Sequence, residues 1–416
     1  MQSTRGMHDI LPEDIKYWQH IYQIALENLN IASYQEIRTP IIEDQSLFLR
    51  SIGEQTDIVN KEMYNFLDRG GRHLTLRPEG TAGIARSIIQ HKLCRQKQVQ
   101  RLWYMGPMFR YERPQHGRQR QFHQLGIECY GSTNPAMDAQ IIYLADHILQ
   151  KLQCNQYTIE LNSIGSLEKR GQYEIKLRDY LETYYNDLSP DSKSRFHDNT
   201  IRLLDSKDKH LQEILSEAPQ ISSVLDSTSL EHLEKVQDCL SNMGVNYIVN
   251  TKLVRGLDYY NDTVFEIKTN LLGTQDTICG GGRYDTLTSQ LGSEAIPAMG
   301  WGMGLERLLL LVQKNLLLDT TKIYFYIATD GEGAINYALS LIPLFQEEKL
   351  KYEIDFSTST LRKQIQKAHK KEAKICLLIG ENEIDNQSIT VKWLDEHKQV
   401  TYSKQNFITM VKSLSI

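Results

Sequence analysis

The 416-residue sequence predicts an α+β fold built on a large antiparallel sheet, followed by a smaller α/β unit. Two strand-like stretches, 102–111 and 121–130, flank a polar segment with Pro and Gly, which is typical of a long hairpin. Further strand-like segments, 263–267 and 299–303, follow without the regular βαβ alternation of a parallel sheet. Near residue 320 the pattern changes to short alternating strands and helices, which indicates a second domain.

The first domain also contains several predicted helices. Helical spacing of apolar residues predicts one helix over 13–32. Asn134-Pro135 opens a second helix that runs to Leu152, with proline near the first helical position, where its missing N–H costs nothing. An apolar helix over 305–311 follows the strand 299–303 directly. Residues 168 to about 240 are polar, charged and helical in pattern, which predicts an inserted helical subdomain.

A boundary near residue 320 divides the chain into a domain of residues 1–319 and an α/β domain of residues 320–416. The second domain shows the short connections and regular alternation of a compact α/β unit. Its predicted elements are a strand at 323–328, a helix at 333–348, a strand at 352–356, a helix at 361–371 and a strand at 375–379.

The composition is that of an ordinary globular protein, with 40% hydrophobic and 24% charged residues and a net charge of −5. No apolar run approaches the roughly 18 residues of a membrane helix, and the N-terminus has neither a signal core nor a transit pattern. The six cysteines are scattered, which argues against a zinc knuckle and a disulfide-stapled domain. We expect no membrane partner, no dedicated metal, and a location in the cytoplasm or in the stroma or matrix of an organelle with its own copy.

The most informative segment is FRYERPQHGRQRQF, residues 109–122, at the tip of the predicted hairpin. Strand alternation puts Arg110 and Glu112 on one face. An arginine suits a phosphate, because its planar fork donates two parallel hydrogen bonds and stays charged. Glu112 can accept from an exocyclic amine, and Phe122 can stack on a base. Taken alone, the segment is more typical of a surface hairpin whose charges are solvated.

Two other segments change that interpretation. GMGLER, residues 302–307, ends a glycine-punctuated strand and begins a helix, which places Arg307 in the first turn. YQEIRTPIIED, residues 34–44, contains Pro40. With the hairpin, these segments resemble motifs 1, 2 and 3 of the class II aminoacyl-tRNA synthetases, in that order.

Three further segments narrow the resemblance. They are TLRPEGT at 75–81, LVRGLDYYNDTVFE at 253–266 and CGGGRYD at 279–285. Together they are similar to signatures of the histidyl-tRNA synthetase family, and the resemblance covers essentially the whole chain. It implies a class II catalytic domain, an anticodon-binding α/β domain, ATP, L-histidine and tRNA(His) as substrates, and a homodimer whose interface includes the Pro40 segment. The reaction implied is formation of histidyl-adenylate and transfer of histidine to the tRNA.

The chemistry of that reaction sets its own demands. A carboxylate and a triphosphate repel each other, so cations must neutralise the α-phosphate and the attacking carboxylate, and Arg110 and Arg255 are the candidates. Glu79, Thr81 and Gln124 can hold the histidine ammonium, while Glu128 and Tyr260 can hold opposite ends of the imidazole. The resemblance adds Gly80, Tyr259 and Tyr284 to the histidine site, and Arg118, Arg120 and Arg307 to Arg110, Glu112 and Phe122 as ATP-binding residues.

For each of these residues a structural role is also open. Glu79 suits the start of a helix, and Tyr259 can be a core aromatic. Gly280 to Gly282 can form an ordinary turn, and Arg255 can be a surface residue ahead of Gly256. Magnesium is expected to arrive with ATP rather than in a dedicated protein cage.

RNA contacts are predicted at two places. Arg113 and Gln115 at the hairpin tip match positions that face the tRNA acceptor end in the family. The basic segment 361–374 is either a solvated helix face or an anticodon contact.

A non-catalytic alternative is the synthetase-like regulatory subunit of ATP phosphoribosyltransferase. Such a protein would need neither the catalytic arginine nor an anticodon domain. Arg110, Glu112, Arg255 and Arg307 are all present, and residues 320–416 follow, which favours the enzyme.

Overall fold

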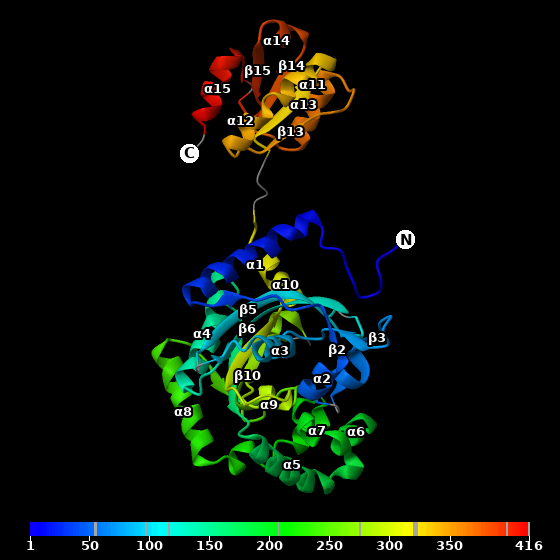
Figure 1. Cartoon of the computed structure of the whole chain (residues 1–416), viewed down its shortest axis with the longest axis vertical. Coiled ribbons are helices and arrows are strands. Elements are labelled where there is room, and N and C mark those ends of the chain that lie inside the picture. Colours follow the sequence, from blue (N-terminus) through cyan, green and yellow to red (C-terminus); the bar gives the residue numbers. More distant parts are fainter. Residues whose placement is uncertain are drawn as a thin grey trace. The chain divides into compact units, whose positions relative to one another are not determined.

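The chain forms two compact units, Met1–Leu317 and Leu318–Ile416. The computed structural model shown in Figure 1 describes every residue except 54–55, 96–97, 115–116, 207, 274–275, 319–322, 397 and 415–416. Each unit has its own sheet and its own hydrophobic core.

An eight-stranded sheet forms the centre of the first unit, in the order β1-β5-β6-β11-β10-β9-β7-β8. The pairs β1–β5 and β7–β8 are parallel, and the other neighbours are antiparallel, so the predicted α+β class is confirmed. The strands are β1 (Gln35–Glu36), β5 (Gln100–Phe109), β6 (Gln121–Tyr130), β7 (Thr158–Ser163), β8 (Ile248–Val249), β9 (Asn261–Lys268), β10 (Thr277–Arg283) and β11 (Ala298–Gly304).

Long helices cover one face of this sheet (Figure 1). Asn134 caps α4, because its side chain accepts a hydrogen bond of 2.9 Å from the Ala136 N–H, and Pro135 occupies the first turn. On the sheet, Trp301 donates its indole N–H to the Ile141 carbonyl of α4 at 2.9 Å. The helices in contact with this face are α1 (Pro12–Ile31), α4 (Pro135–Lys151), α8 (Ser227–Asn242) and α10 (Leu305–Asn315).

The other face of the sheet is covered by shorter elements. A three-stranded sheet has the order β2-β4-β3 and precedes helix α3. The bounds of these elements are β2 (Ile42–Asp44), α2 (Gln45–Ile52), η1 (Ile58–Glu62), β3 (Tyr64–Leu67), β4 (His73–Leu76), α3 (Thr81–His91) and α9 (Leu287–Gln290). A short helix, η6 (Asn270–Leu272), lies in the connection between β9 and β10.

Helices occupy the chain between β7 and β8, where the sequence predicts the insertion, and α8 is the last of them. Tyr173, Leu177 and Leu181 lie one turn apart on α5 and are buried in the core of the first unit, as helical periodicity requires. Before α8 the insertion contains α5 (Leu167–Glu182), η3 (Tyr185–Asp187), α6 (Pro190–Asp198), η4 (Thr200–Asp205), α7 (Lys209–Ile214) and η5 (Ile221–Val224).

The second unit has a five-stranded sheet of order β13-β12-β14-β15-β16. The helix predicted over 333–348 is two helices, because Pro343 lacks an N–H and cannot continue the first one. Strands β15 and β16 are additions to the prediction. The elements are β12 (Phe325–Thr329), α11 (Glu332–Leu339), α12 (Ile342–Glu347), β13 (Tyr352–Ile354), α13 (Leu361–Lys370), β14 (Ile375–Ile379), α14 (Glu381–Asp385), β15 (Ser388–Trp393), β16 (Lys398–Ser403) and α15 (Lys404–Lys412).

The interpretation of Gly280 to Gly282 as a turn is wrong, because all three lie within the central strand β10. A Cβ atom on Gly281 would stand 2.2 Å from the Gly300 carbonyl oxygen and 2.6 Å from the Trp301 Cβ. The backbone of β11 and its large aromatic side chain therefore occupy the space that any other residue would need.

A buried ion cluster joins this strand to the helical layer. Arg283 donates to both carboxylate oxygens of Asp138 on α4, at 2.9 and 2.7 Å, and to Asp285 at 2.9 Å. His232 of the insertion lies 2.8 Å from Asp138. Among the described residues, no helix combines the length and apolar composition needed to cross a membrane.

We predict that Gly281→Ala lowers the free energy of unfolding by about 1–3 kcal/mol, because the added methyl group overpacks the β10–β11 contact. Chemical denaturation of the purified variant would measure this. Gly171→Ala is the matched control: it lies inside α5 with no atom within 4 Å of its added Cβ, so it should stabilise the protein by about 0.5–1 kcal/mol. Equal stabilities for the two variants would contradict the packing argument.

Candidate active site

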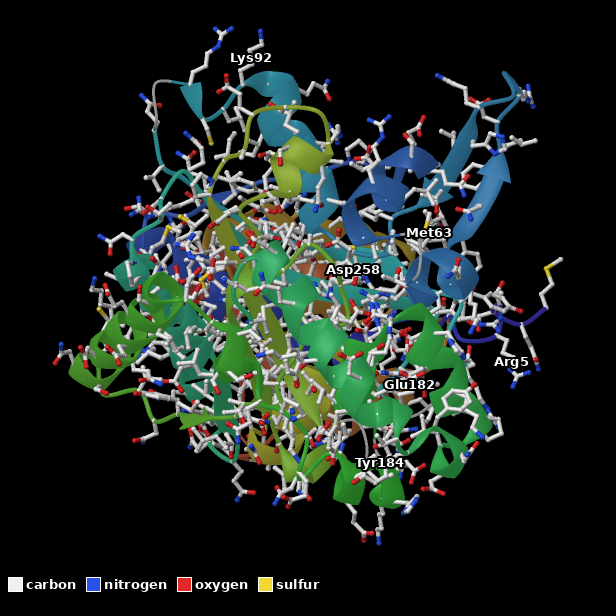
Figure 2. All side chains as sticks on the ribbon, turned by 90° about the horizontal axis from the view of Figure 1, so that it is seen from below. Arg5, Met63, Lys92, Glu182, Tyr184 and Asp258 are labelled. Carbon is white, nitrogen blue, oxygen red and sulfur yellow. The ribbon has the colours of Figure 1, made fainter. Side chains whose placement is uncertain are left out.

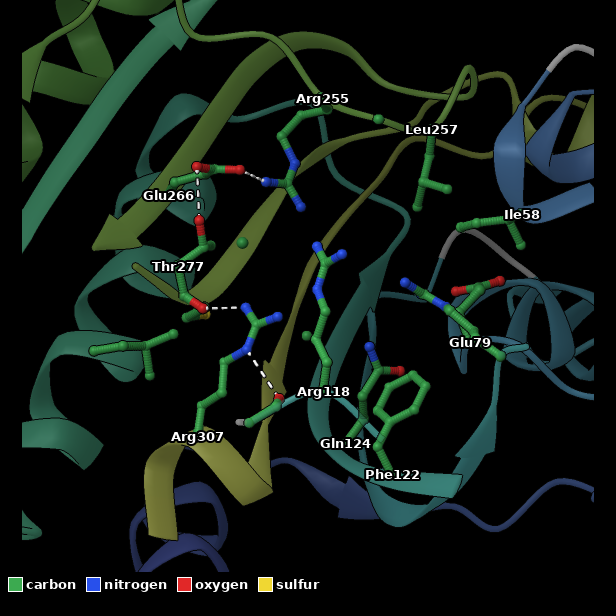
Figure 3. Close-up of a pocket in the computed structure, with 18 of the residues that line it drawn as sticks. Ile58, Glu79, Arg118, Phe122, Gln124, Arg255, Leu257, Glu266, Thr277 and Arg307 are labelled. Carbon is green, nitrogen blue, oxygen red and sulfur yellow. Dashed lines mark hydrogen bonds and ion pairs between the residues drawn. The ribbon is translucent and has the colours of Figure 1, made fainter. Parts of the chain in front are cut away.

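A cavity of about 570 Å³ opens on the face of the sheet opposite the long helices (Figure 3). Its wall comes from the hairpin β5–β6, from β9, β10 and β11, and from the segment 255–260 that precedes β9. The predicted site residues that line it are Glu79, Thr81, Arg110, Glu112, Arg118, Phe122, Gln124, Arg255, Tyr259, Tyr260 and Arg307.

The floor of this cavity is a stretch of sheet without side chains. Gly280 of β10 pairs with Gly302 of β11, and both line the cavity. A Cβ atom on Gly280 would lie 2.5 Å from the guanidinium nitrogens of Arg255, and one on Gly302 would lie 3.2 Å from the Gln124 amide. The glycines therefore make room for two polar side chains that lie across the strands.

Three arginines from different parts of the chain direct their guanidinium groups into this space (Figure 3). Arg255 forms an ion pair with Glu266 and lies 5.5 Å from the centre of the Tyr260 ring. Arg307 donates to the Thr277 carbonyl at 2.6 Å and to the Gly117 carbonyl at 3.3 Å. Arg118 pairs with Glu112 at 3.1 Å.

Arg307 is buried among positive charges. Burial, and next the positive charge of Arg118, lower the pKa of Arg307. A guanidinium group in this position stays protonated, since its ordinary pKa is far above neutrality. An incoming anion would relieve both the desolvation and the mutual repulsion. The cavity is therefore suited to a polyanion.

Arg110 also lines the cavity. Its Nε donates to the Pro78 carbonyl at 2.9 Å, and its guanidinium carbon is 5.2 Å from the centre of the Phe122 ring. Arg110 and Glu112 both line the cavity, with 3.9 Å between their charged atoms. Strand alternation is not the reason, because β5 ends at Phe109 and the Glu112 N–H donates to the Arg110 carbonyl at 2.8 Å.

Glu79 both caps a helix and lines the cavity. Its carboxylate accepts from the backbone N–H groups of Thr81 and Ala82, both at 2.7 Å, so it does cap the start of α3. It also lines the cavity, and burial raises its pKa. A buried carboxylate with capacity left for a further donor is a suitable partner for an ammonium group.

Glu128 lies behind the cavity wall and is completely buried. Thr81 donates its hydroxyl to one carboxylate oxygen at 2.7 Å, and the Tyr284 hydroxyl donates to the other. Burial raises the pKa of Glu128 to about 8. Tyr284 and Gly80 also stand back from the cavity; a Cβ atom on Gly80 would meet the Tyr104 ring at 2.3 Å.

Two predicted residues, Arg120 and Arg113, lie away from the cavity. Arg120 turns away from the cavity and stacks on Tyr111, with 3.6 Å between its guanidinium carbon and the ring centre. Arg113 is exposed at the hairpin tip. Gln115 lies outside the described residues.

Sequence reasoning missed several lining residues, among them Tyr104, Glu266, Lys268, Asp276 and Glu306. Tyr104 shares a strand face with Met108, and its ring lies against Gly80 and Gly126, where a Cβ atom would come within 2.3 and 2.4 Å. Alternation along β5 was the available signal for Tyr104. Glu266 and Lys268 share a face of β9 in the same way.

Comparisons with known proteins agree with this geometry. A profile of histidyl-tRNA synthetases matches residues 6–308, and a profile of anticodon binding domains matches residues 323–414. The chain is 52% identical to a chloroplastic histidine–tRNA ligase of Gracilaria tenuistipitata var. liui, over 100% of this chain and 98% of that protein. It is 50% identical to a histidine–tRNA ligase of a Cyanothece species, over 98% of this chain and 95% of that protein.

A solved structure of apo histidyl-tRNA synthetase from S. aureus is 34% identical and superimposes with a TM-score of 0.82, covering 99% of this chain and 100% of that one. The sheet, the hairpin and the arginine-lined cavity thus define a class II aminoacyl-tRNA synthetase. The chain belongs to the histidyl-tRNA synthetase family.

We predict that Glu128→Gln removes part of the pH dependence of stability. The folded-state pKa of about 8 exceeds the ordinary 4.5, so the folded protein binds the extra proton between these values. This contribution is fully present below the lower pKa and is lost as the pH rises through the higher one. The wild type should lose on the order of 2 kcal/mol between about pH 6 and 9, and the variant less.

Unfolding free energies of both proteins across this pH range would measure the difference. Glu27→Gln, at an exposed position on α1, is the control and should follow the wild type. A Glu128→Gln variant with the wild-type slope would mean that Glu128 is ionised in the folded protein.

Proposed function

We propose that this chain is a histidine–tRNA ligase. Histidine and ATP would give histidyl-adenylate and pyrophosphate, and the terminal ribose hydroxyl of tRNA(His) would then take the histidyl group. The observation that carries the proposal is the convergence of Arg110, Arg118, Arg255 and Arg307 on the cavity that also contains the carboxylate of Glu79. Membership of the family supports the choice of histidine.

In the activation step, we assign Arg110 and Arg255 to the α-phosphate and the attacking carboxylate. Their side chains reach the cavity from the hairpin and from the segment before β9, so the two substrates would meet between them. Phe122 and Arg307 would hold the adenine ring and the outer phosphates, and Glu112 the adenine amine. Arg118 would reach the outer phosphates; Arg120 would have to leave Tyr111 to do so.

For histidine, we assign the ammonium group to Glu79, Thr81 and Gln124, which lie on the cavity wall. Tyr260 would bind one side of the imidazole. Glu128 would contribute from behind Thr81, with which it shares a hydrogen bond. Gly80, Tyr259 and Tyr284 complete the proposed pocket by packing around these polar groups.

We propose that magnesium accompanies the triphosphate. Among the described residues, no group of three or more His, Cys, Asp and Glu side chains is placed to hold a metal, and Glu266 is engaged by Arg255 and Lys268. This cavity wall fits a magnesium ion whose oxygen ligands come from the phosphates and from water. When bound, it would neutralise charge on the outer phosphates.

For the tRNA, we propose that residues 1–319 form the catalytic domain and residues 320–416 the anticodon-binding domain. The matches to the two family profiles support this division. Arg113 and Gln115 would face the acceptor end, and the basic helix α13 would neutralise anticodon phosphates. We further propose a homodimer, and a location in the cytoplasm or in an organelle stroma or matrix, which the chloroplastic relative supports.

The alternative, a regulatory subunit of ATP phosphoribosyltransferase, is disfavoured. Such a subunit would not need Arg110, Glu112, Arg255 and Arg307 at one cavity, and all four line it here. Residues 323–414 also match an anticodon binding domain, which favours a partner with an anticodon.

ATP–pyrophosphate exchange with each of the twenty amino acids in turn would test the activity. We expect exchange with histidine alone, because unpaired polar groups in a site built for the imidazole would cost a competitor about 1–3 kcal/mol each. Exchange with another amino acid, or with none, would refute the proposal.

We predict that Arg255→Ala lowers the rate of adenylate formation by about 10²–10³-fold, because it removes a cation from the developing charge. Histidine affinity should change far less, and Glu266 would keep Lys268 at 3.2 Å as a partner. Single-turnover kinetics and equilibrium histidine binding would separate the two effects. Arg72→Ala, at an exposed site between β3 and β4, is the control. Turnover at the wild-type rate would remove Arg255 from the reaction.

A further inference from the structure

The helical insertion reaches the segment that carries Arg255. Arg170 of α5 donates to the backbone carbonyl of Asp258 at 3.1 Å and to its carboxylate at 3.2 Å. The side chain of Arg170 is only 11% exposed, so this two-point contact is largely shielded from water. One insertion arginine therefore fixes both the backbone and the side chain of a residue three positions after Arg255.

A second insertion arginine holds the residue directly after Arg255. Arg202 of η4 donates a hydrogen bond to the carbonyl of Gly256, and its other terminal nitrogen lies 3.9 Å from the Asp57 carboxylate. Asn199, which precedes η4, donates to the Asp258 carboxylate at 3.5 Å. Two carbonyls of the segment 256–258 thus accept hydrogen bonds from the insertion.

The same segment is anchored from the opposite side by the end of α2. The Asp258 N–H donates to the Ile52 carbonyl at 3.2 Å, and a Cβ atom on Gly53 would stand 2.3 Å from the Asp258 carboxylate. Gly53 has a φ of +99°, which only glycine adopts readily. Figure 2 shows Asp258 where the green helices of the insertion meet the blue segment that contains α2.

These contacts matter because the segment has no sheet to hold it. It lies between β8 and β9, and residues 252–260 belong to no helix or strand. Before Arg255, Asn162 of β7 donates to the Leu253 carbonyl at 3.0 Å. After Arg255, the direction of the segment is set by the groups of α2 and of the insertion that bind its backbone. Arg255 leaves this segment to lie across Gly280, and Leu257 lines the same cavity. A displacement of the segment would carry both side chains with it.

We propose that Arg170 and Arg202 are positioning residues that hold Arg255 in place for amino-acid activation. The helical insertion then acts on the first chemical step, before any tRNA binds. The inference rests on the proposed function, since it assigns the insertion a part in the same reaction. An insertion that served only as a surface for tRNA would leave that step unchanged.

The test is ATP–pyrophosphate exchange with histidine, without tRNA, on full-length Arg170→Ala and Arg202→Ala variants. A misplaced catalytic group costs about 10²-fold, so we expect kcat to fall by roughly 10–100-fold while histidine affinity changes by less than about threefold. Arg170→Lys should recover part of the rate, because an ammonium still reaches one oxygen of Asp258. Thermal unfolding of each variant checks that it is folded. If Arg170→Ala does not fold, the exchange rate of Arg202→Ala tests the inference instead.

Arg178→Ala is the matched control on the same helix. Arg178 contacts Thr200 at 3.2 Å and Glu174 at 3.3 Å, both within the insertion, so its loss should leave exchange at the wild-type rate. In an Arg255→Ala background, Arg170→Ala should cause no further loss, because the residue that it positions is absent.

Three results would overturn the inference: exchange by Arg170→Ala equal to that of Arg178→Ala, independent and multiplicative losses in the double variant, or a defect confined to tRNA charging. A wild-type protein without histidine exchange would instead refute the proposed function, so the two failures are distinguishable.

Discussion

The site depends on a patch of sheet that carries no side chains on the face turned toward the cavity. Gly280 and Gly302 pair across β10 and β11, and the guanidinium of Arg255 lies where a Cβ on Gly280 would be. On the opposite face of the same strand, Trp301 and the backbone of β11 occupy the space that a side chain on Gly281 would need. Glycine is therefore required on both faces, for a charged site on one and for close packing on the other.

The arrangement of charge follows from that floor. Arginines from the hairpin, from the segment before β9 and from α10 meet in one cavity, where mutual repulsion and desolvation oppose their approach. The folded protein offsets this cost with Glu112, Glu266 and backbone carbonyls. A substrate with several negative charges would do so more completely. A site held in this way is organised for a polyanion before that ligand arrives.

The surroundings of the cavity differ in how firmly they are held. Arg307 stands on α10, directly after a sheet strand, and Glu79 is fixed by two N–H groups of α3. Arg255 stands on an irregular segment whose backbone is bound by α2 and by the insertion. The position of Arg255 thus depends on elements that are far away in sequence. The insertion is separate from the site residues in the sequence, but in the folded protein it binds the segment that carries Arg255.

The sequence by itself determined the local features: the hairpin, the start of α4 at Asn134-Pro135 and the helical insertion. It also singled out Arg110, Glu112 and Arg307, which all line the cavity. These features follow from the periodicity of the sequence and from residue type, and both can be seen in residues that are close together in the chain.

Only the tertiary structure decided that Gly280 to Gly282 form a strand rather than a turn, and that Arg120 stacks on Tyr111. It likewise placed Glu128 behind Thr81 and brought Arg202 to Gly256. Each of these outcomes depends on a partner many residues away. The direction of a side chain is set by which distant atoms fill the space around it, and local pattern carries no record of them.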